Sequence, residues 1–176
     1  DPNQKGIDIM YDCIEPVVKE YGTFVLLGTG DPTWESKLRD LAVILNAKYG
    51  NHTSINIQFD TKLADEIYLA SDFFFVPSRF EPCGLTQMMA MFYGALPIVR
   101  DTGGLKDSVI DSVNGFKFKT YSSEELLTTI GRAMKFFNNK PVYEKMVQVA
   151  LEADYSWGSS ALEYKKLYQN ILKSGE

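Results

Sequence analysis

The chain has 176 residues, of which 45% are hydrophobic, and this is enough apolar material for one domain with a substantial core. Its net charge of −5 argues against a nucleic-acid partner or an anionic membrane surface, because phosphate groups select basic faces. The single histidine, His52, and the two separated cysteines, Cys13 and Cys83, offer no histidine triad and no zinc motif, and they are typical of a reducing compartment.

Helices and strands are predicted to alternate along the chain. Residues 5–21 place apolar side chains at helical spacing, and Pro16 is expected to kink that helix or to end it early. Residues 32–50 begin with proline and end with glycine, which is the usual asymmetry of a helix. The remaining helices are predicted at 61–71, at 84–94 and, as two or three amphipathic segments, from Ser122 onward. Short apolar runs predict the strands, at 23–28, 54–59, 72–77, 95–100 and 115–118.

This alternation predicts an α/β fold, a Rossmann-like doubly wound parallel sheet with helices on both faces, in a single domain over residues 1–176. The C-terminal helices, at about 141–173, are expected to pack on that domain, with Trp157 docked against it. In such sheets the ligand lies at the carboxyl ends of the strands. The candidate loops are therefore those that follow the strands, at 28–31, 59–61, 78–86 and 100–104.

Two glycines, Gly28 and Gly30, follow the first predicted strand. They would allow a ligand to approach the backbone closely. Thr33 stands where a dinucleotide-binding motif has its third glycine, so this segment makes no motif by itself. A tight turn that requires positive φ explains the two glycines equally well.

The loop at 78–86, SRFEPCGLT, concentrates functional groups after the third strand. A helix is predicted to start at Gly84, so the amides of Gly84, Leu85 and Thr86 would point out of its N-terminus and could bind a phosphate. Glu81 is better placed for hydroxyl groups beside that anion. The alternative is that Glu81 is a solvated loop acid and Thr86 a simple helix cap.

Three further residues have two interpretations each. Lys5 begins the first predicted helix, where a cation is unfavourable unless a phosphate compensates, but it is otherwise an ordinary surface lysine. Phe59 ends a strand and is either a stacking surface for a nucleobase or a core residue. Cys83 is included with the substrate-binding loop, although no nearby base favours a thiolate, so the alternative is a small packing residue.

Five segments together resemble a known family. They are QKGIDIM, LLGTGDP, ASDFFFVPSRFEPCGLTQ, GALPIVRDTGGL and YSWGSSALEYKKLY. These segments resemble the glycogen and starch synthases, retaining glycosyltransferases with the two-domain GT-B architecture. The resemblance covers nearly the whole chain and implies the C-terminal, nucleotide-sugar-binding domain. One departure is Met88, which stands seven residues after Glu81, where a looser transferase signature has a second acid.

The resemblance implies a role for each candidate residue. Glu81 would hold glucose hydroxyls of the donor, the 84–86 segment would bind the distal phosphate, and Lys5 would neutralise the diphosphate leaving group. Phe59 falls where family members stack an aromatic ring on adenine. Negative charge grows on the phosphate as the anomeric bond breaks, so a lysine and a helix N-terminus would stabilise the transition state preferentially.

The implied reaction is the retaining transfer of glucose from ADP-glucose to the non-reducing 4-hydroxyl of an α-1,4-glucan, in glycogen or starch synthesis, with no cofactor and no metal. Its partners would be the nucleotide sugar, the glucan acceptor and an N-terminal domain outside this chain. That domain would bring a Lys-x-Gly-Gly loop and an active-site histidine, and a partner arginine would lie just before Asp1.

The isolated chain is therefore expected to fold without transferring glucose. The implied compartment is the cytoplasm of a bacterium or the plastid stroma of a plant, and no apolar run approaches the roughly 20 residues of a membrane span. Two alternatives stay open. One is another GT-B transferase that uses UDP-glucose or a different acceptor, and the other is a non-catalytic doubly wound nucleotide-binding module.

Overall fold

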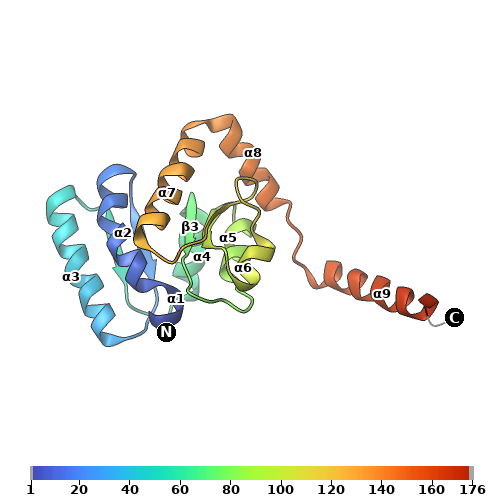
Figure 1. Ribbon diagram of the computed structural model, residues 1–176. Coiled ribbons are helices and arrows are strands. Elements are labelled where there is room, and N and C mark those ends of the chain that lie inside the picture. Colours follow the sequence, from blue (N-terminus) through green and yellow to red (C-terminus); the bar gives the residue numbers. More distant parts are fainter. Residues whose placement is uncertain (1, 175–176) are drawn as a thin grey trace.

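Residues 2–174 are described by a computed structural model, in which helices and strands alternate (Figure 1). The alternation runs from α1 (Pro2–Lys5) to β5 (Phe116–Phe118), and the helices that follow make up most of the remaining described residues. Every strand predicted from an apolar run is present. The arrangement confirms the α/β fold class.

The strands pair in parallel, in two hydrogen-bonded groups. β1 (Phe24–Leu27) pairs with β2 (Thr53–Asn56). β3 (Phe73–Val76) pairs with β4 (Leu96–Arg100), which also pairs with β5. Within each group the carboxyl ends of the strands lie at one edge, and the loops that leave this edge are the ones that carry the candidate residues.

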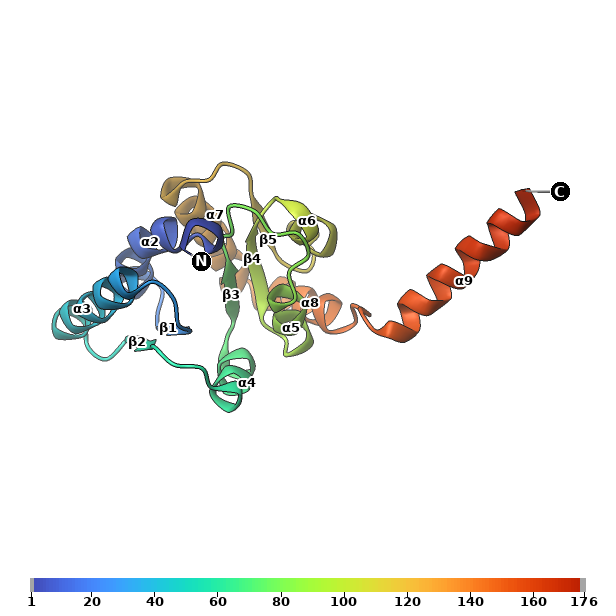
Figure 2. The same ribbon diagram turned by 90° about the horizontal axis from the view of Figure 1, so that it is seen from below.

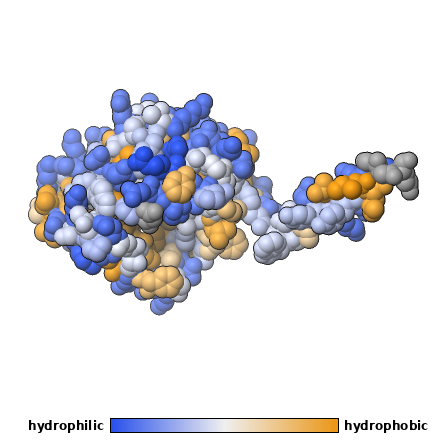
Figure 3. Space-filling view, turned by 60° about the horizontal axis from the view of Figure 1, so that its bottom comes forward, coloured by the Kyte–Doolittle hydropathy of each residue, from blue (hydrophilic) through white to orange (hydrophobic). Residues whose placement is uncertain are grey.

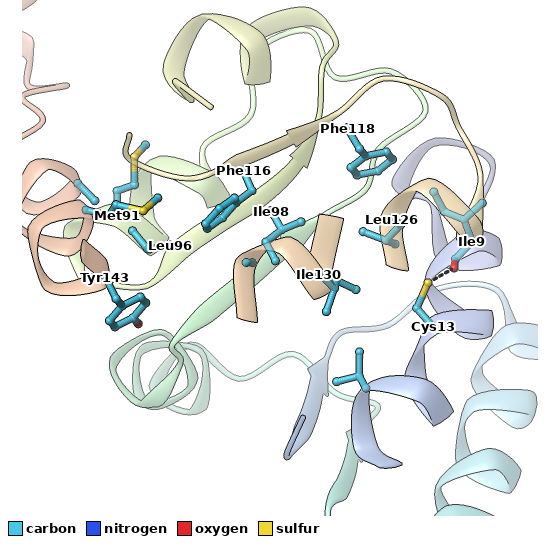
Figure 4. Close-up of a cluster of buried hydrophobic side chains, with 14 residues drawn as sticks. Ile9, Cys13, Met91, Leu96, Ile98, Phe116, Phe118, Leu126, Ile130 and Tyr143 are labelled. Atoms are coloured by element: carbon cyan, nitrogen blue, oxygen red, sulfur yellow. Dashed lines mark hydrogen bonds between the residues drawn. The ribbon is translucent and has the colours of Figure 1, made fainter. Parts of the chain in front are cut away.

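Helices cover both faces of these strands. On β4, Ile98 is fully buried in a cluster that includes side chains of α2 (Ile7–Glu20) and α7 (Ser123–Asn138) (Figure 4). The next residue, Val99, is fully buried in a second cluster, with a leucine of α6 (Gly103–Ser108). Because successive strand residues point to opposite faces, β4 is covered on both sides, as a doubly wound sheet requires.

The other helices of the domain are α3 (Pro32–Tyr49), α4 (Thr61–Ala70), α5 (Thr86–Phe92) and α8 (Lys140–Leu151). The side chain of Asp31 accepts hydrogen bonds from two amides in the first turn of α3, and Gly50 ends that helix, as predicted. The predicted early end at Pro16 does not occur, because α2 continues to Glu20. No helix within the described residues is long and apolar enough to cross a membrane.

The last helix, α9 (Trp157–Ser174), projects away from the domain (Figures 1 and 2). Trp157 is 88% exposed, and apolar side chains gather near the far end of the helix, where Figure 3 shows an orange stripe. The expectation that Trp157 docks on the domain is therefore wrong. The amphipathic pattern predicted the helix and its apolar face, but apolar side chains of this face, such as Leu167 and Ile171, are more than half exposed.

We predict that removing residues 157–176 leaves thermal stability unchanged, because the apolar side chains of α9 are exposed rather than packed in the core. Just before α9, the Tyr155 hydroxyl donates a hydrogen bond to the Ser108 carbonyl oxygen at 2.8 Å. The truncated chain keeps this bond. Calorimetry should give a Tm within about 2 °C of the starting chain, whereas a loss of 1 kcal/mol would lower Tm by roughly 2–4 °C. A drop of more than about 5 °C would show that α9 packs on the domain.

Candidate active site

Lys5 and Glu81, which are 76 positions apart, meet at the carboxyl end of β3. The Lys5 Nζ lies 2.7 Å from Oε2 of Glu81, and the Ser78 hydroxyl donates to the same oxygen at 3.1 Å. Glu81 is only 8% exposed, so it is not the solvated loop acid of the alternative interpretation. A buried carboxylate needs such partners, because an unpaired charge away from water is costly.

The backbone around Lys5 differs from the prediction. Lys5 ends the short helix α1 rather than beginning a longer one, and Gly6 separates α1 from α2 in a left-handed conformation with φ 72°. A Cβ on Gly6 would overlap the carbonyl oxygen of Pro77, so this junction accepts glycine alone. The amide of Arg79 also donates to the Gln4 carbonyl at 2.7 Å, which fixes α1 on the loop that follows β3.

The backbone of Glu81 packs on α6, a helix that the sequence pattern did not predict, since residues 100–104 were expected to form a loop. The amide of Gly104 donates to the carbonyl oxygen of Glu81 at 3.0 Å. A Cβ on Gly103 would overlap that same oxygen, and a Cβ on Gly104 would overlap the backbone of Cys83. The two glycines therefore let the start of α6 pack directly on the backbone that carries Glu81.

The segment after Glu81 is more open than predicted. Helix α5 begins at Thr86, not at Gly84, because Gly84 has a left-handed backbone with φ 77° that cannot belong to a helical turn. Leu85 is 67% exposed and Thr86 is also exposed. Leu85 occupies the N-cap position without a side-chain hydrogen bond, so Thr86 is not the cap residue. The segment presents backbone and one hydroxyl to solvent.

Gln87 and Arg100 hold this loop in place, and the sequence pattern did not single them out. The buried Gln87 donates through Nε2 to the Gly84 carbonyl at 2.8 Å and to the Ser108 hydroxyl at 3.0 Å. Arg100 donates to the carbonyl oxygens of Ser78 and Arg79, at 3.2 and 2.7 Å. Gln87 lies four residues before the buried Met91, and this helical spacing was the signal that could have revealed it.

Gly28 and Gly30 line a cavity of about 1010 Å³, together with Lys5 and Thr86. Neither glycine has positive φ, so the predicted tight turn is not the reason for glycine here. A Cβ on either one would have no neighbour within 4 Å, so packing is not the reason either. Close approach of a ligand to the backbone remains as the reason, although both amides already have acceptors: Gly28 donates to the Asn56 carbonyl at 3.0 Å and Gly30 to Glu35 at 2.8 Å.

Phe59 and Cys83 do not have the structural roles that their alternative interpretations gave them. Phe59 is 90% exposed in the loop between β2 and α4, so it is not a core residue. The thiol of Cys83 is exposed, so its side chain does not pack in the interior, and only its backbone contacts the start of α6. The exposed ring of Phe59 is free to receive a flat ligand group.

A polar cluster of Tyr121, Arg79 and Asp8 lies beside the Lys5–Glu81 pair. The ring of Tyr121 lies 4.0 Å from the guanidinium of Arg79, and its hydroxyl donates to Asp8 in the first turn of α2. Burial and the bond to Asp8 raise the pKa of Tyr121 to about 12, so the hydroxyl stays protonated and donating at neutral pH.

Among the described residues no group of three or more His, Cys, Asp and Glu side chains could hold a metal ion.

Comparison with known proteins identifies the family of this chain. Residues 2–152 match the family model described as glycosyl transferases group 1. The chain belongs to this family. Among curated members it is 46% identical over 176 residues to the glycogen synthase of Lactococcus lactis and 43% identical over 175 residues to that of Clostridium novyi. Each alignment covers 96% of this chain and 36% of the relative, so the chain spans about a third of their length.

Solved structures agree with this assignment. The catalytic domain of starch synthase IV from Arabidopsis thaliana, described as bound to ADP and acarbose, has a TM-score of 0.83 and 36% identity, over 95% of this chain and 36% of that one. The C-terminal domain of the group 1 glycosyl transferase LpcC from Francisella tularensis shares the fold, with a TM-score of 0.68 and 20% identity over 85% and 77% of the two chains. The resemblance to glycogen and starch synthases is confirmed.

Proposed function

We propose that this chain is the nucleotide-sugar-binding domain of a glucosyltransferase that uses ADP-glucose to extend an α-1,4-glucan with retention of configuration. The observation that carries the proposal is the pair of Lys5 and Glu81 at 2.7 Å, beside the open backbone of the glycine-rich loop. The glycogen synthases at 43–46% identity and the starch synthase described with ADP and acarbose support it.

Lys5 and Glu81 would divide the donor between them. The Lys5 side chain is 53% exposed, so it can turn from Glu81 toward the diphosphate when the donor binds. The carboxylate of Glu81, still bonded to Ser78, would then accept hydrogen bonds from glucose hydroxyls. Lys5 would stabilise the charge that grows on the phosphate as the anomeric bond breaks, which is worth more in the transition state than in the ground state.

The remaining contacts would come from backbone and from one ring. The amides of the 84–86 segment would bind the phosphates, and Thr86 would add its hydroxyl. Gly28 and Gly30, which carry no side chain, would let the donor lie close to the backbone. Phe59 would stack on the adenine, and Cys83 would contribute backbone only. No side chain of the loop is an evident nucleophile, so the acceptor hydroxyl would attack on the face of the leaving group, which preserves the anomeric configuration.

The acceptor would bind to an N-terminal domain outside this chain, which closes the other side of the cleft. We therefore predict that residues 1–176 alone fold but do not lengthen glycogen supplied with ADP-glucose. Transfer of radiolabelled glucose by the isolated chain would contradict the division of the site between two domains. The whole enzyme would work in the cytoplasm of a bacterium or in the plastid stroma.

The donor is tested by assaying the full-length enzyme on glycogen with ADP-glucose and with UDP-glucose. We expect a higher kcat/KM with ADP-glucose, and α-linked glucose in the product by NMR. A preference for UDP-glucose would overturn the donor assignment, and a β-linked product would overturn retention. Failure of both donors would instead favour a different acceptor or a non-catalytic nucleotide-binding role.

We predict that replacing Phe59 with alanine weakens ADP binding to the full-length enzyme by about 5- to 150-fold, because stacking on a base contributes roughly 1–3 kcal/mol. Isothermal titration calorimetry measures this directly. Phe92→Ala is the matched control, since Phe92 is also an exposed aromatic residue, at 72%, but lies at the end of α5 away from the strand-end loops. Equal ADP affinity of Phe59→Ala and the unchanged enzyme would exclude the stacking role.

A further inference from the structure

Gln87 is a fully buried polar side chain that lies behind the backbone of the 84–86 segment. Its Nε2 donates to the carbonyl oxygen of Gly84 at 2.8 Å and to the hydroxyl of Ser108 at 3.0 Å. A carbonyl oxygen can only accept, so the atom of the side chain that faces Gly84 must be the amide nitrogen. Gln87 therefore holds the Gly84 carbonyl toward the interior of the domain.

The other polar atom of this side chain, Oε1, is buried and has no hydrogen-bond partner among the described residues. A Cβ on Gly84 would lie only 2.6 Å from this oxygen, so the absence of a side chain at Gly84 is what allows the amide to come so close. A buried acceptor without a partner costs free energy, and an apolar side chain of the same length would avoid that cost. Packing alone therefore does not explain a glutamine at this position, whereas its bond to the loop backbone does.

The bond from Gln87 to Gly84 sets the direction of the next amide in the chain. In a trans peptide the C=O group and the following N–H group lie in one plane and point in opposite directions. Because the Gly84 carbonyl points inward, the N–H of Leu85 points to the exposed side of the loop. No group within residues 2–174 accepts a hydrogen bond from this N–H. The next residue, Thr86, lines the cavity that Lys5 also lines, so the free amide lies beside the candidate donor site.

Gln87 is also connected to the backbone of Glu81, through α6. The Ser108 hydroxyl, which accepts from Gln87, donates in turn to the Gly104 carbonyl at 2.9 Å. The amide of Gly104 donates to the Glu81 carbonyl at 3.0 Å. This series of bonds joins the backbone of Glu81 to the backbone of Gly84, so the two halves of the loop are held in a fixed relation.

We propose that Gln87 is a positioning residue that aims the amide of Leu85 at the distal phosphate of the nucleotide sugar. This rests on the proposed function, in which the 84–86 segment binds that phosphate. An amide that already points at the anion binds it without reorganisation of the loop. Without the bond from Gln87, the peptide after Gly84 would be free to turn over, because glycine permits many backbone conformations. The effect falls on the distal phosphate, which ADP has and AMP lacks.

The test measures the affinities of ADP and AMP for the full-length enzyme and for its Gln87→Met variant, by isothermal titration calorimetry. Methionine has nearly the same length as glutamine and fills the same buried space, but it has no N–H to donate. We expect the affinity for ADP to fall by about 10- to 150-fold, the usual loss for a hydrogen bond to a charged group. The affinity for AMP should change by less than about threefold, because AMP has no distal phosphate.

Asn46→Leu is the matched control, because it also replaces a side-chain amide that bonds to backbone. Asn46, in α3, donates to the Thr53 carbonyl at 2.8 Å and accepts from the Thr53 amide at 2.9 Å. Thr53 lies at the amino end of β2, whereas the loop of Gln87 follows the carboxyl end of β3. This variant should lower Tm and leave the ratio of ADP affinity to AMP affinity unchanged. Equal weakening of ADP and AMP in Gln87→Met would show a merely structural role and would overturn the proposal.

Ser108→Ala decides the question if Gln87→Met does not fold. It removes the hydroxyl that holds Nε2 of Gln87 on the side away from Gly84, and it should weaken ADP by about 3- to 10-fold with AMP unchanged. An unchanged ratio of the two affinities in Gln87→Met, or in Ser108→Ala where the first variant does not fold, would overturn the positioning role alone. If the unchanged enzyme bound ADP no more tightly than AMP, the phosphate site of the proposed function would fail, and the positioning role with it.

Discussion

Replacing Lys5 with alanine in the full-length enzyme is expected to lower kcat for glucose transfer by about 10²- to 10³-fold, the usual loss when one stabilising group is removed from a developing anion. The ammonium of Lys5 is the positive charge nearest to Glu81, at 2.7 Å, and its half-exposed side chain can reach a diphosphate in the cavity that it lines. KM for ADP-glucose should change much less than kcat, because the charge is greatest in the transition state. Steady-state kinetics with glycogen as acceptor give both values.

Lys48→Ala is the matched control for this variant. Lys48 also pairs with a glutamate, as its Nζ lies 2.8 Å from Glu15, but this pair joins α3 to α2 on the outer surface. An exposed pair contributes little to stability, so activity should be unchanged. Equal kcat in Lys5→Ala and the unchanged enzyme would exclude the proposed role. A rise in KM with unchanged kcat would mean that Lys5 contributes to substrate binding but not to stabilisation of the transition state.

Local signals were sufficient to predict most of the secondary structure. The boundaries of α3 follow from Asp31, Pro32 and Gly50, which each act within one turn of the helix end. The strands follow from apolar runs whose residues must be buried on both faces. The rule that ligands bind at strand ends then selected the loop of Glu81, and the structure places Lys5 in contact with it.

Features that depend on distant partners could not be predicted in this way. The start of α5 was placed two residues too early, since only the left-handed backbone of Gly84 shows that the turn precedes the helix. Helix α6 was missed because two glycines are poor helix formers, and their packing partner, the Glu81 backbone, lies more than 20 positions away. The position of α9 could not be predicted either, because an amphipathic pattern shows that a helix has an apolar face but not where that face lies relative to the domain.

The second large effect is expected from Gly104→Ala, at a residue that contacts the site through backbone alone. Glycine to alanine within a helix normally stabilises a protein by about 0.5–1 kcal/mol. Here the new Cβ would overlap the backbone of Cys83, which cannot turn aside as a flexible side chain could. We expect destabilisation of about 1–3 kcal/mol and a Tm lower by roughly 2–12 °C, by calorimetry.

The same change should also reduce transfer in the full-length enzyme, because the Gly104 amide holds the carbonyl of Glu81 at 3.0 Å. A shift of about 1 Å in a positioned group can cost 100-fold in rate. Gly131→Ala in α7 is the matched control, since its Cβ would meet only the Tyr21 hydroxyl, at 3.4 Å, and should keep or raise Tm. Equal stability and activity of Gly104→Ala and Gly131→Ala would show that the start of α6 does not fix the Glu81 backbone. The side-chain hydrogen bonds of Glu81 to Lys5 and Ser78 would then position it instead.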